Sequence, residues 1–156
     1  MAWHPRLSTL QIVDATGTPL DVDVANEDGD FSVDGLIQGN TQLEALYDRG
    51  AFDQLIATQD VQITGSFSYR VGDWASSTDR AIDAAMKIGA FASAVSTHSS
   101  GDGVLYTVNW TTVKSGSTYK LALAKCLFTT AISEGSPAAT TTLSFICYGG
   151  ATFTKT

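Results

Sequence analysis

Apolar and polar residues alternate along most of this chain, as they do in strands that bury one face. Residues 8–13 form the first such segment, and Leu20, Val22 and Val24 continue the alternation after the turn-rich residues 14–19. Residues 61–70 alternate again, and Gly65 within them marks a bulge or the close approach of another backbone. The pattern therefore predicts a mainly β chain.

The C-terminal third has the same character. Residues 104–111, 119–128 and 140–148 alternate, and residues 114–117 (Lys-Ser-Gly-Ser) are typical of a tight hairpin turn. In the segment 119–128, strict alternation puts Leu121, Leu123 and Leu127 on one face, and it puts Cys126 and Phe128 on the other.

A second hairpin can be predicted to the residue. If its centre lies between Ser136 and Pro137, Cys126 faces Cys147. Phe128 then faces Phe145, and Thr130 faces Leu143. We expect the two cysteines to be reduced, because a bridge between directly opposed strand residues strains the usual disulfide geometry.

One segment predicts a helix, over residues 77–94. Ser and Thr at 76–78 are good N-cap residues, and Ile82, Met86 and Gly89 recur at helical spacing on one face. Residues 35–60 are harder to read, because they combine three glycines with scattered apolar side chains. We expect short strands there, joined by a long ordered loop, since loops of this length are functional or disordered and this one is too apolar for disorder.

These elements predict one domain over residues 1–156, with residues 1–7 as a flexible arm. The expected fold is mainly β, a β-sandwich or a barrel-like pair of sheets, with one flanking α-helix. The first residues lack the apolar region of a secretory signal, and no apolar segment approaches the ~20 residues that span a bilayer. We therefore expect synthesis in the cytoplasm and no membrane partner.

Charge is distributed unevenly along the 156 residues, whose net charge is −7. Residues 14–60 hold eleven acids and one base, Arg49. The remainder is close to neutral. Binding to a phosphate backbone needs clustered Lys and Arg, so this distribution argues against a nucleic-acid-binding protein.

No residues have the arrangement that catalysis or metal binding needs. His4 and His98 have no second ligand at metal-binding spacing, and two cysteines are too few for a zinc site. Asp28, Asp30 and Asp34 alternate like a calcium loop, but the glycine and glutamate of that motif are missing. Four aromatic residues could stack on the bases of a single-stranded nucleic acid: Phe67, Tyr69, Tyr106 and Trp110. No Lys or Arg accompanies them, so we expect them to be core residues instead. We expect neither an enzyme nor a cofactor.

Four segments in order resemble the tail tube (major tail) proteins of long-tailed bacteriophages. They are residues 27–32 (Glu-Asp-Gly-Asp-Phe-Ser), 46–53 (Leu-Tyr-Asp-Arg-Gly-Ala-Phe-Asp), 61–70 (ending in Ser-Phe-Ser-Tyr-Arg) and 133–145. The resemblance implies a fold shared with the type VI secretion tube. It also implies hexameric rings whose sheets join into one inner barrel, and rings that stack into a tube in the virion tail.

The same resemblance implies partners and a location. The chain would assemble with copies of itself in the host cytoplasm, and it would meet tail terminator, baseplate and tape-measure proteins. DNA would pass through the lumen without specific binding, because acidic walls repel phosphates.

On this hypothesis residues 39–59 contact neighbouring subunits and the strand from residue 62 lines the lumen. The inter-subunit residues would be Leu43, Leu46, Tyr47, Arg49, Phe52, Leu55 and Ile56. The lumen residues would be Gln62, Thr64, Ser66 and Ser68. The helix would lie outside the barrel.

Other functions remain open at this stage. A tail terminator, a head decoration protein or a type VI tube protein would have a similar fold. A monomeric β-barrel that binds a small molecule belongs to a different class, as does an enzyme whose site has no recognisable motif.

Overall fold

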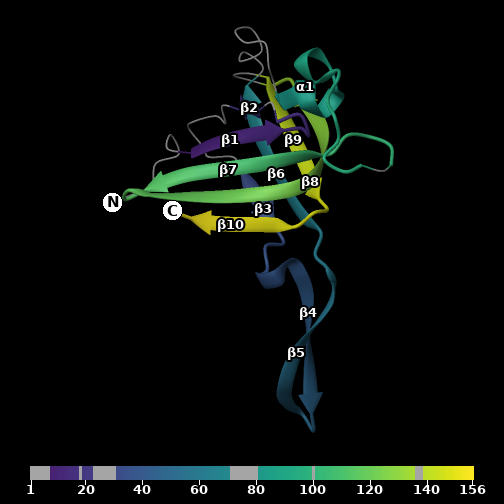
Figure 1. Cartoon of the computed structure of the whole chain (residues 1–156), viewed down its shortest axis with the longest axis vertical. Helices are drawn as coiled ribbons and strands as arrows, with labels where there is room; N and C mark the ends of the chain where they lie inside the picture. Colours follow the sequence, from purple (N-terminus) through teal and green to yellow (C-terminus); the bar gives the residue numbers. More distant parts are fainter. Residues whose placement is uncertain (1–7, 18, 23–30, 71–80, 100, 136–138) are drawn as a thin grey trace.

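The computed structural model describes residues 8–17, 19–22, 31–70, 81–99, 101–135 and 139–156. The chain is mainly β, with a curled antiparallel half-barrel sheet, a small two-stranded sheet and one short helix (Figure 1). This confirms the predicted fold class in its barrel-like form. The elements in chain order are β1 (Ser8–Val13), β2 (Pro19–Val22), β3 (Ser32–Asp34), η2 (Gln38–Asn40), β4 (Thr41–Asp48), β5 (Ala51–Asp60), β6 (Ile63–Arg70), α1 (Ala81–Met86), η4 (Gly89–Phe91), β7 (Tyr106–Lys114), β8 (Ser117–Ser133), β9 (Thr140–Cys147) and β10 (Ala151–Lys155).

The large sheet has the order β2-β1-β7-β8-β9-β6-β3, and β10 pairs with β8. The 17-residue β8 joins its two halves, since its first half pairs with β7 and β10 and its second half with β9. A β-bulge lies at this junction. Tyr106 pairs with Cys126 while Val108 pairs with Leu123, and Lys125 has a φ of 56°. Such a bulge bends a strand, so it accounts for part of the curl.

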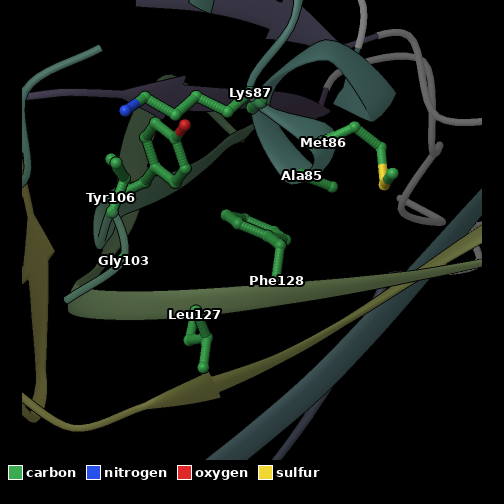
Figure 2. A pocket seen from close by; sticks show the side chains of 9 residues that line it. Ala85, Met86, Lys87, Gly103, Tyr106, Leu127 and Phe128 are labelled. Atoms are coloured by element: carbon green, nitrogen blue, oxygen red, sulfur yellow. The ribbon is translucent and has the colours of Figure 1, made fainter. Parts of the chain in front are cut away.

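The bulge corrects one prediction about β8. Strict alternation placed Leu121 and Leu123 with Leu127, and opposite Cys126 and Phe128. The extra residue reverses the alternation, so Leu121, Leu123, Cys126 and Phe128 are all buried in the core while Leu127 is exposed. Figure 2 shows Leu127 and Phe128 leaving β8 on opposite sides.

The core lies where the sheet curls over itself. Side chains from β1 and β7 meet those from β6 and β9 in one cluster, and Phe31 stacks between Trp110 and Phe145 at ring-centroid distances of 6.1 and 6.2 Å. Gly65 is closely approached, as its sequence position suggested. A Cβ there would lie 2.4 Å from the ring of Phe145, so only glycine lets that ring cross the strand.

Several other predictions are confirmed. Cys126 faces Cys147, Phe128 faces Phe145 and Thr130 faces Leu143 in the β8–β9 register. Lys114 pairs with Ser117 across the predicted turn. β1, β2 and β6 lie where alternation put them, although Val24, the N-cap residues of the helix and residues 1–7 fall outside the described part.

The helix ends earlier than predicted, and its described residues face the core differently. α1 ends at Met86 because Lys87 adopts a φ of 55°, and the amide of Ile88 bonds the carbonyl of Asp83 at 3.0 Å. This is the pattern of a Schellman C-cap. The predicted apolar face of Ile82, Met86 and Gly89 is wrong, since Met86 is exposed and the buried residues of α1 are alanines, Ala81 and Ala84.

Residues 35–60, where short strands joined by a long loop were expected, form mostly one long β-hairpin. β4 and β5 pair antiparallel around Arg49 and Gly50, both with positive φ. Figure 1 shows this hairpin extending away from the large sheet. Its strands pair with each other and with no other described strand.

Candidate functional site

One face of the β4–β5 hairpin is apolar between Leu43 and Tyr47. Leu43, Ala45 and Tyr47 alternate along β4, and their register partners on β5 are Ala57, Leu55 and Phe52. Side chains of paired strand residues project from the same face, so these six side chains form one surface. We call it the hairpin face: Leu43, Ala45, Tyr47, Phe52, Leu55 and Ala57.

The hairpin face is largely exposed to solvent. Tyr47 is 68% exposed and Phe52 60%, and their rings meet edge to face at 6.5 Å. Every residue of β5 is exposed, although half of them are apolar. Contiguous apolar patches that are exposed to solvent mark interaction sites.

The opposite face of the hairpin is mixed. It pairs Glu44 with Ile56 and Leu46 with Gln54, and the amide of Gln59 donates a hydrogen bond to Gln42 at 2.8 Å. Residues 41–60 carry four acids and one base. The hairpin is therefore amphipathic and negatively charged.

Asn40 anchors the base of the hairpin to the large sheet. Its side-chain amide donates to the Ala151 carbonyl at 3.0 Å and accepts from the Ala151 N–H at 3.0 Å. Its own carbonyl accepts from Val61, the first residue after β5, at 3.1 Å. The hairpin thus leaves the body at a fixed point beside β10.

All seven residues predicted to contact neighbouring subunits lie in the hairpin. Leu43, Tyr47, Phe52 and Leu55 share the hairpin face, whereas Leu46 and Ile56 lie on the opposite face and Arg49 lies in the turn. Sequence reasoning missed Ala45 and Ala57. Once residues 41–60 are read as a hairpin, alternation identifies both.

The residues predicted to line a lumen lie on the side of the large sheet opposite the core. Thr64, Ser66 and Ser68 alternate with the buried Ile63 and Phe67 along β6. Gln62 precedes β6 and is exposed. A shallow hollow of about 350 Å³ crosses this face. Asp34 and the apolar Leu127 and Ile146 line it together with hydroxyl side chains from four strands: Ser32, Thr64, Ser66, Thr129 and Ser144.

A second hollow, of about 290 Å³, lies between α1 and the large sheet (Figure 2). Tyr106, Phe128 and Ala85 line it, and the Tyr106 hydroxyl points toward the stem of Lys87. That hydroxyl is buried and has no hydrogen-bond partner among the residues that the structure describes. Burial, with a smaller contribution from the Asp14 carboxylate, raises the pKa of Tyr106 to about 12.

The two cysteines are buried and free. The Cys147 thiol donates to the Ala124 carbonyl at 2.9 Å, and the Cys126 thiol donates to the Leu123 carbonyl at 3.5 Å. The neighbouring Cys147 thiol, together with burial, raises the pKa of Cys126. Cys126 is therefore a protonated, inaccessible thiol, which makes it a poor nucleophile.

Among the described residues, no group of three or more His, Cys, Asp and Glu side chains could hold a metal ion. Of the residues that suggested a calcium loop, Asp34 is exposed, and Asp28 and Asp30 lie outside the described part. The described helices include none long and apolar enough to span a membrane.

No protein-family model and no curated protein matches this sequence. Among solved structures, a chain in the cryo-EM structure of the anti-feeding prophage baseplate, six-fold symmetrised, is similar at a TM-score of 0.49. The two sequences are 8% identical, and the match covers 100% of this chain and 94% of that one.

Proposed function

We propose that this chain is a self-assembling structural subunit of a phage-tail-like particle, and specifically a tail tube subunit that forms stacked rings. The observation that carries this proposal is the hairpin face, an apolar surface held clear of the subunit's own core. The sequence resemblance to tail tube proteins gives the proposal its specific form.

Stability supports an intermolecular role for the hairpin. An isolated two-stranded hairpin is only marginally stable in water, and it needs a third strand or a packed face to persist. Within the described part of one subunit, β4 and β5 pair with no other strand, and Asn40 hydrogen-bonds the base of the hairpin to Ala151. A neighbouring copy would cover Tyr47, Phe52 and Leu55, and it would remove from water a surface that a monomer exposes.

The large sheet supports assembly in the same way. In the described part of the chain, β2 pairs only with β1, and β10 only with β8. Unpaired strand edges invite pairing with another chain. A head-to-tail contact between two different edges closes into a ring when the rotation between subunits permits.

The hydroxyl-lined face of the sheet suits the wall of a channel. Thr64, Ser66 and Ser68, with Thr129 and Ser144, present short neutral side chains that cannot hold DNA by releasing counterions. Four of the eleven acids counted in the sequence lie on the hairpin instead: Glu44, Asp48, Asp53 and Asp60. We infer a lumen that is lined by hydroxyl groups along β6 and through which DNA slides.

The proposed particle supplies the remaining partners and the location. The subunit would act in the tail of a virion, after assembly in the host cytoplasm. It would contact tail terminator, baseplate and tape-measure proteins at the ends and inside of the tube. No cofactor takes part.

Negative-stain microscopy of the purified protein at high concentration tests the proposal. Wild type should form rings or tubes with a central channel. Replacing Tyr47, Phe52 and Leu55 together by Thr should leave a folded monomer that does not assemble. The matched control is Gln54→Thr, on the opposite face of β5, which should assemble like wild type.

Two results would contradict the proposal. Wild type that stays monomeric at millimolar concentration would exclude self-assembly. Tubes formed equally well by the triple variant would show that the hairpin face is not the contact.

A further inference from the structure

The open edge of β10 offers a specific set of unpaired backbone groups. The Gly150 carbonyl accepts from Ala124 on β8 at 3.1 Å, and Thr156 exchanges two hydrogen bonds with Thr118, at 2.8 and 2.9 Å. Backbone groups of successive strand residues point to opposite edges. Residues 150, 152, 154 and 156 therefore face β8, whereas Ala151, Phe153 and Lys155 face away from it.

Asn40 already pairs with the first of these outward residues. Its side chain makes with Ala151 the two hydrogen bonds that a neighbouring strand residue would make. The N–H and C=O groups of Phe153 and Lys155 are next along this edge, and no described strand pairs with them. Asn40 thus occupies the backbone groups of Ala151 at this edge, and no described strand pairs with those of Phe153 and Lys155.

Two aromatic side chains, Tyr119 and Phe153, lie beside this edge of β10, beyond the buried core. Phe153 and Lys155 are register partners of Leu121 and Tyr119, so they lie on the core side of the sheet. Phe153 is nevertheless 60% exposed, and its ring lies 6.2 Å from that of Tyr119. The Lys155 ammonium lies 5.5 Å from the Tyr119 ring centroid. We call Tyr119, Phe153 and Lys155 the β10 patch.

The β10 patch and the hairpin carry opposite charges. Residues 106–125 and 139–156, which carry the patch, contain four lysines and no Asp or Glu. The hairpin, residues 41–60, contains four acids and one base. Opposite potentials on two surfaces of one molecule favour head-to-tail contact between copies and oppose contact of like with like.

We propose that the β10 patch of one copy receives the hairpin of a second copy, which adds a strand at the open edge of β10. Tyr47 and Phe52 pack against Phe153 and Tyr119, and the acids of the hairpin face the lysines. A strand of the hairpin is long enough to pair along the whole edge of β10. The ten residues of β5 span ~34 Å, and the five residues of β10 span ~17 Å. This inference rests on the proposed self-assembly and names its receiving surface.

The test compares the concentration at which five proteins begin to sediment as assemblies. Wild type sets the reference. Lys155→Glu and Asp53→Lys, which each reverse one exposed charge, should each raise the threshold about threefold to tenfold. The double variant Lys155→Glu/Asp53→Lys should return it to within about twofold of wild type, because the attraction is restored with the signs exchanged. Lys87→Glu, the same change at the exposed residue that follows α1, is the matched control and should leave the threshold unchanged.

Phe153→Thr extends the test to the apolar part of the contact. It should raise the threshold at least about tenfold, since buried aromatic residues dominate interface energies. Circular dichroism of the dilute monomer should match wild type, because Phe153 is exposed there.

The outcomes separate the two proposals. If wild type forms tubes and both Lys155→Glu and Phe153→Thr form them at the same concentration, the receiving surface is wrong and self-assembly stands. If the single variants weaken assembly but the double variant does not recover, the patch binds something other than the hairpin, and the inference is wrong. Wild type that never assembles overturns both.

Discussion

Two antiparallel strand pairs in this molecule each place two aromatic residues opposite each other, but the rings are buried in one pair and exposed in the other. In the β8–β9 pair, Phe128 faces Phe145 and both rings are buried, with Phe145 only 2% exposed. In the β4–β5 pair, Tyr47 faces Phe52 and both rings lie in solvent. The local pairing is equivalent, so the difference lies in what the rest of the chain brings to each pair.

The large sheet curls far enough to cover the first pair with its own side chains. The hairpin leaves the body at Asn40 and is covered by nothing in the described structure. Burying an aromatic side chain is among the larger favourable contributions to folding or association. One subunit obtains that contribution in its core, and we infer that the hairpin obtains it from a second subunit.

Truncating one ring in each pair gives the largest expected difference. Phe145→Ala should lower the free energy of unfolding by about 3–5 kcal/mol, because it leaves a cavity in a packed core. Phe52→Ala should change it by less than about 0.5 kcal/mol, because that ring is exposed in the monomer. Urea unfolding followed by tryptophan fluorescence, at a concentration where the protein is monomeric, measures both values. Equal costs would mean that the hairpin packs against its own subunit.

Substitutions of Asn40, which joins the hairpin to the large sheet, should have an intermediate effect on the free energy of unfolding. Asn40→Asp keeps an acceptor for the Ala151 N–H but loses the donor to the Ala151 carbonyl, so it should cost about 1 kcal/mol. Asn40→Gly tolerates the φ of 54° equally well and loses both bonds, so it should cost about 1 kcal/mol more. Amide exchange of residues 151–155 should accelerate in the same order. Unchanged exchange in both variants would show that Asn40 does not hold the hairpin to β10.

The smallest effect is expected at the buried Tyr106. Its pKa is raised from 10.0 to about 12, so the folded state favours the neutral phenol and the unfolded chain ionises first. This contribution to stability is complete below pH 10 and is lost as the pH rises toward 12. Tyr106→Phe should therefore be less sensitive to pH between 10 and 12 than wild type. At pH 7 it should be as stable as wild type or up to about 1 kcal/mol more stable, since the hydroxyl has no partner among the described residues. A steeper alkaline loss in the variant would contradict this assignment.

Local patterns in the sequence predict much of the large sheet. Alternation identifies β1, β6 and β7, and the turn residues identify the β7–β8 hairpin. A single assumed centre reproduces the β8–β9 register, including the Cys126–Cys147 pair. These features depend on residues close together in the chain, where turn chemistry and the two-residue period fix the pairing.

The features that were mispredicted depend on single backbone positions or on distant packing. The bulge at Lys125 reverses which side chains of β8 face the core, and no glycine or proline in β8 indicates its position. The helix ends at Met86 because the next residue, Lys87, adopts a left-handed conformation, which composition does not indicate. Alternation predicts only short strands joined by a long loop in residues 35–60, because the β4–β5 pairing has two register shifts, between Thr41 and Leu43 and between Leu46 and Tyr47.

Hydrogen exchange of residues 41–60, compared between dilute and concentrated protein, tests the central claim most directly. The account predicts rapid exchange in the dilute monomer. It predicts strong protection of the same peptides once assemblies sediment, with peptides of the core changing little. Assemblies that form while residues 41–60 exchange as fast as in the monomer would contradict it.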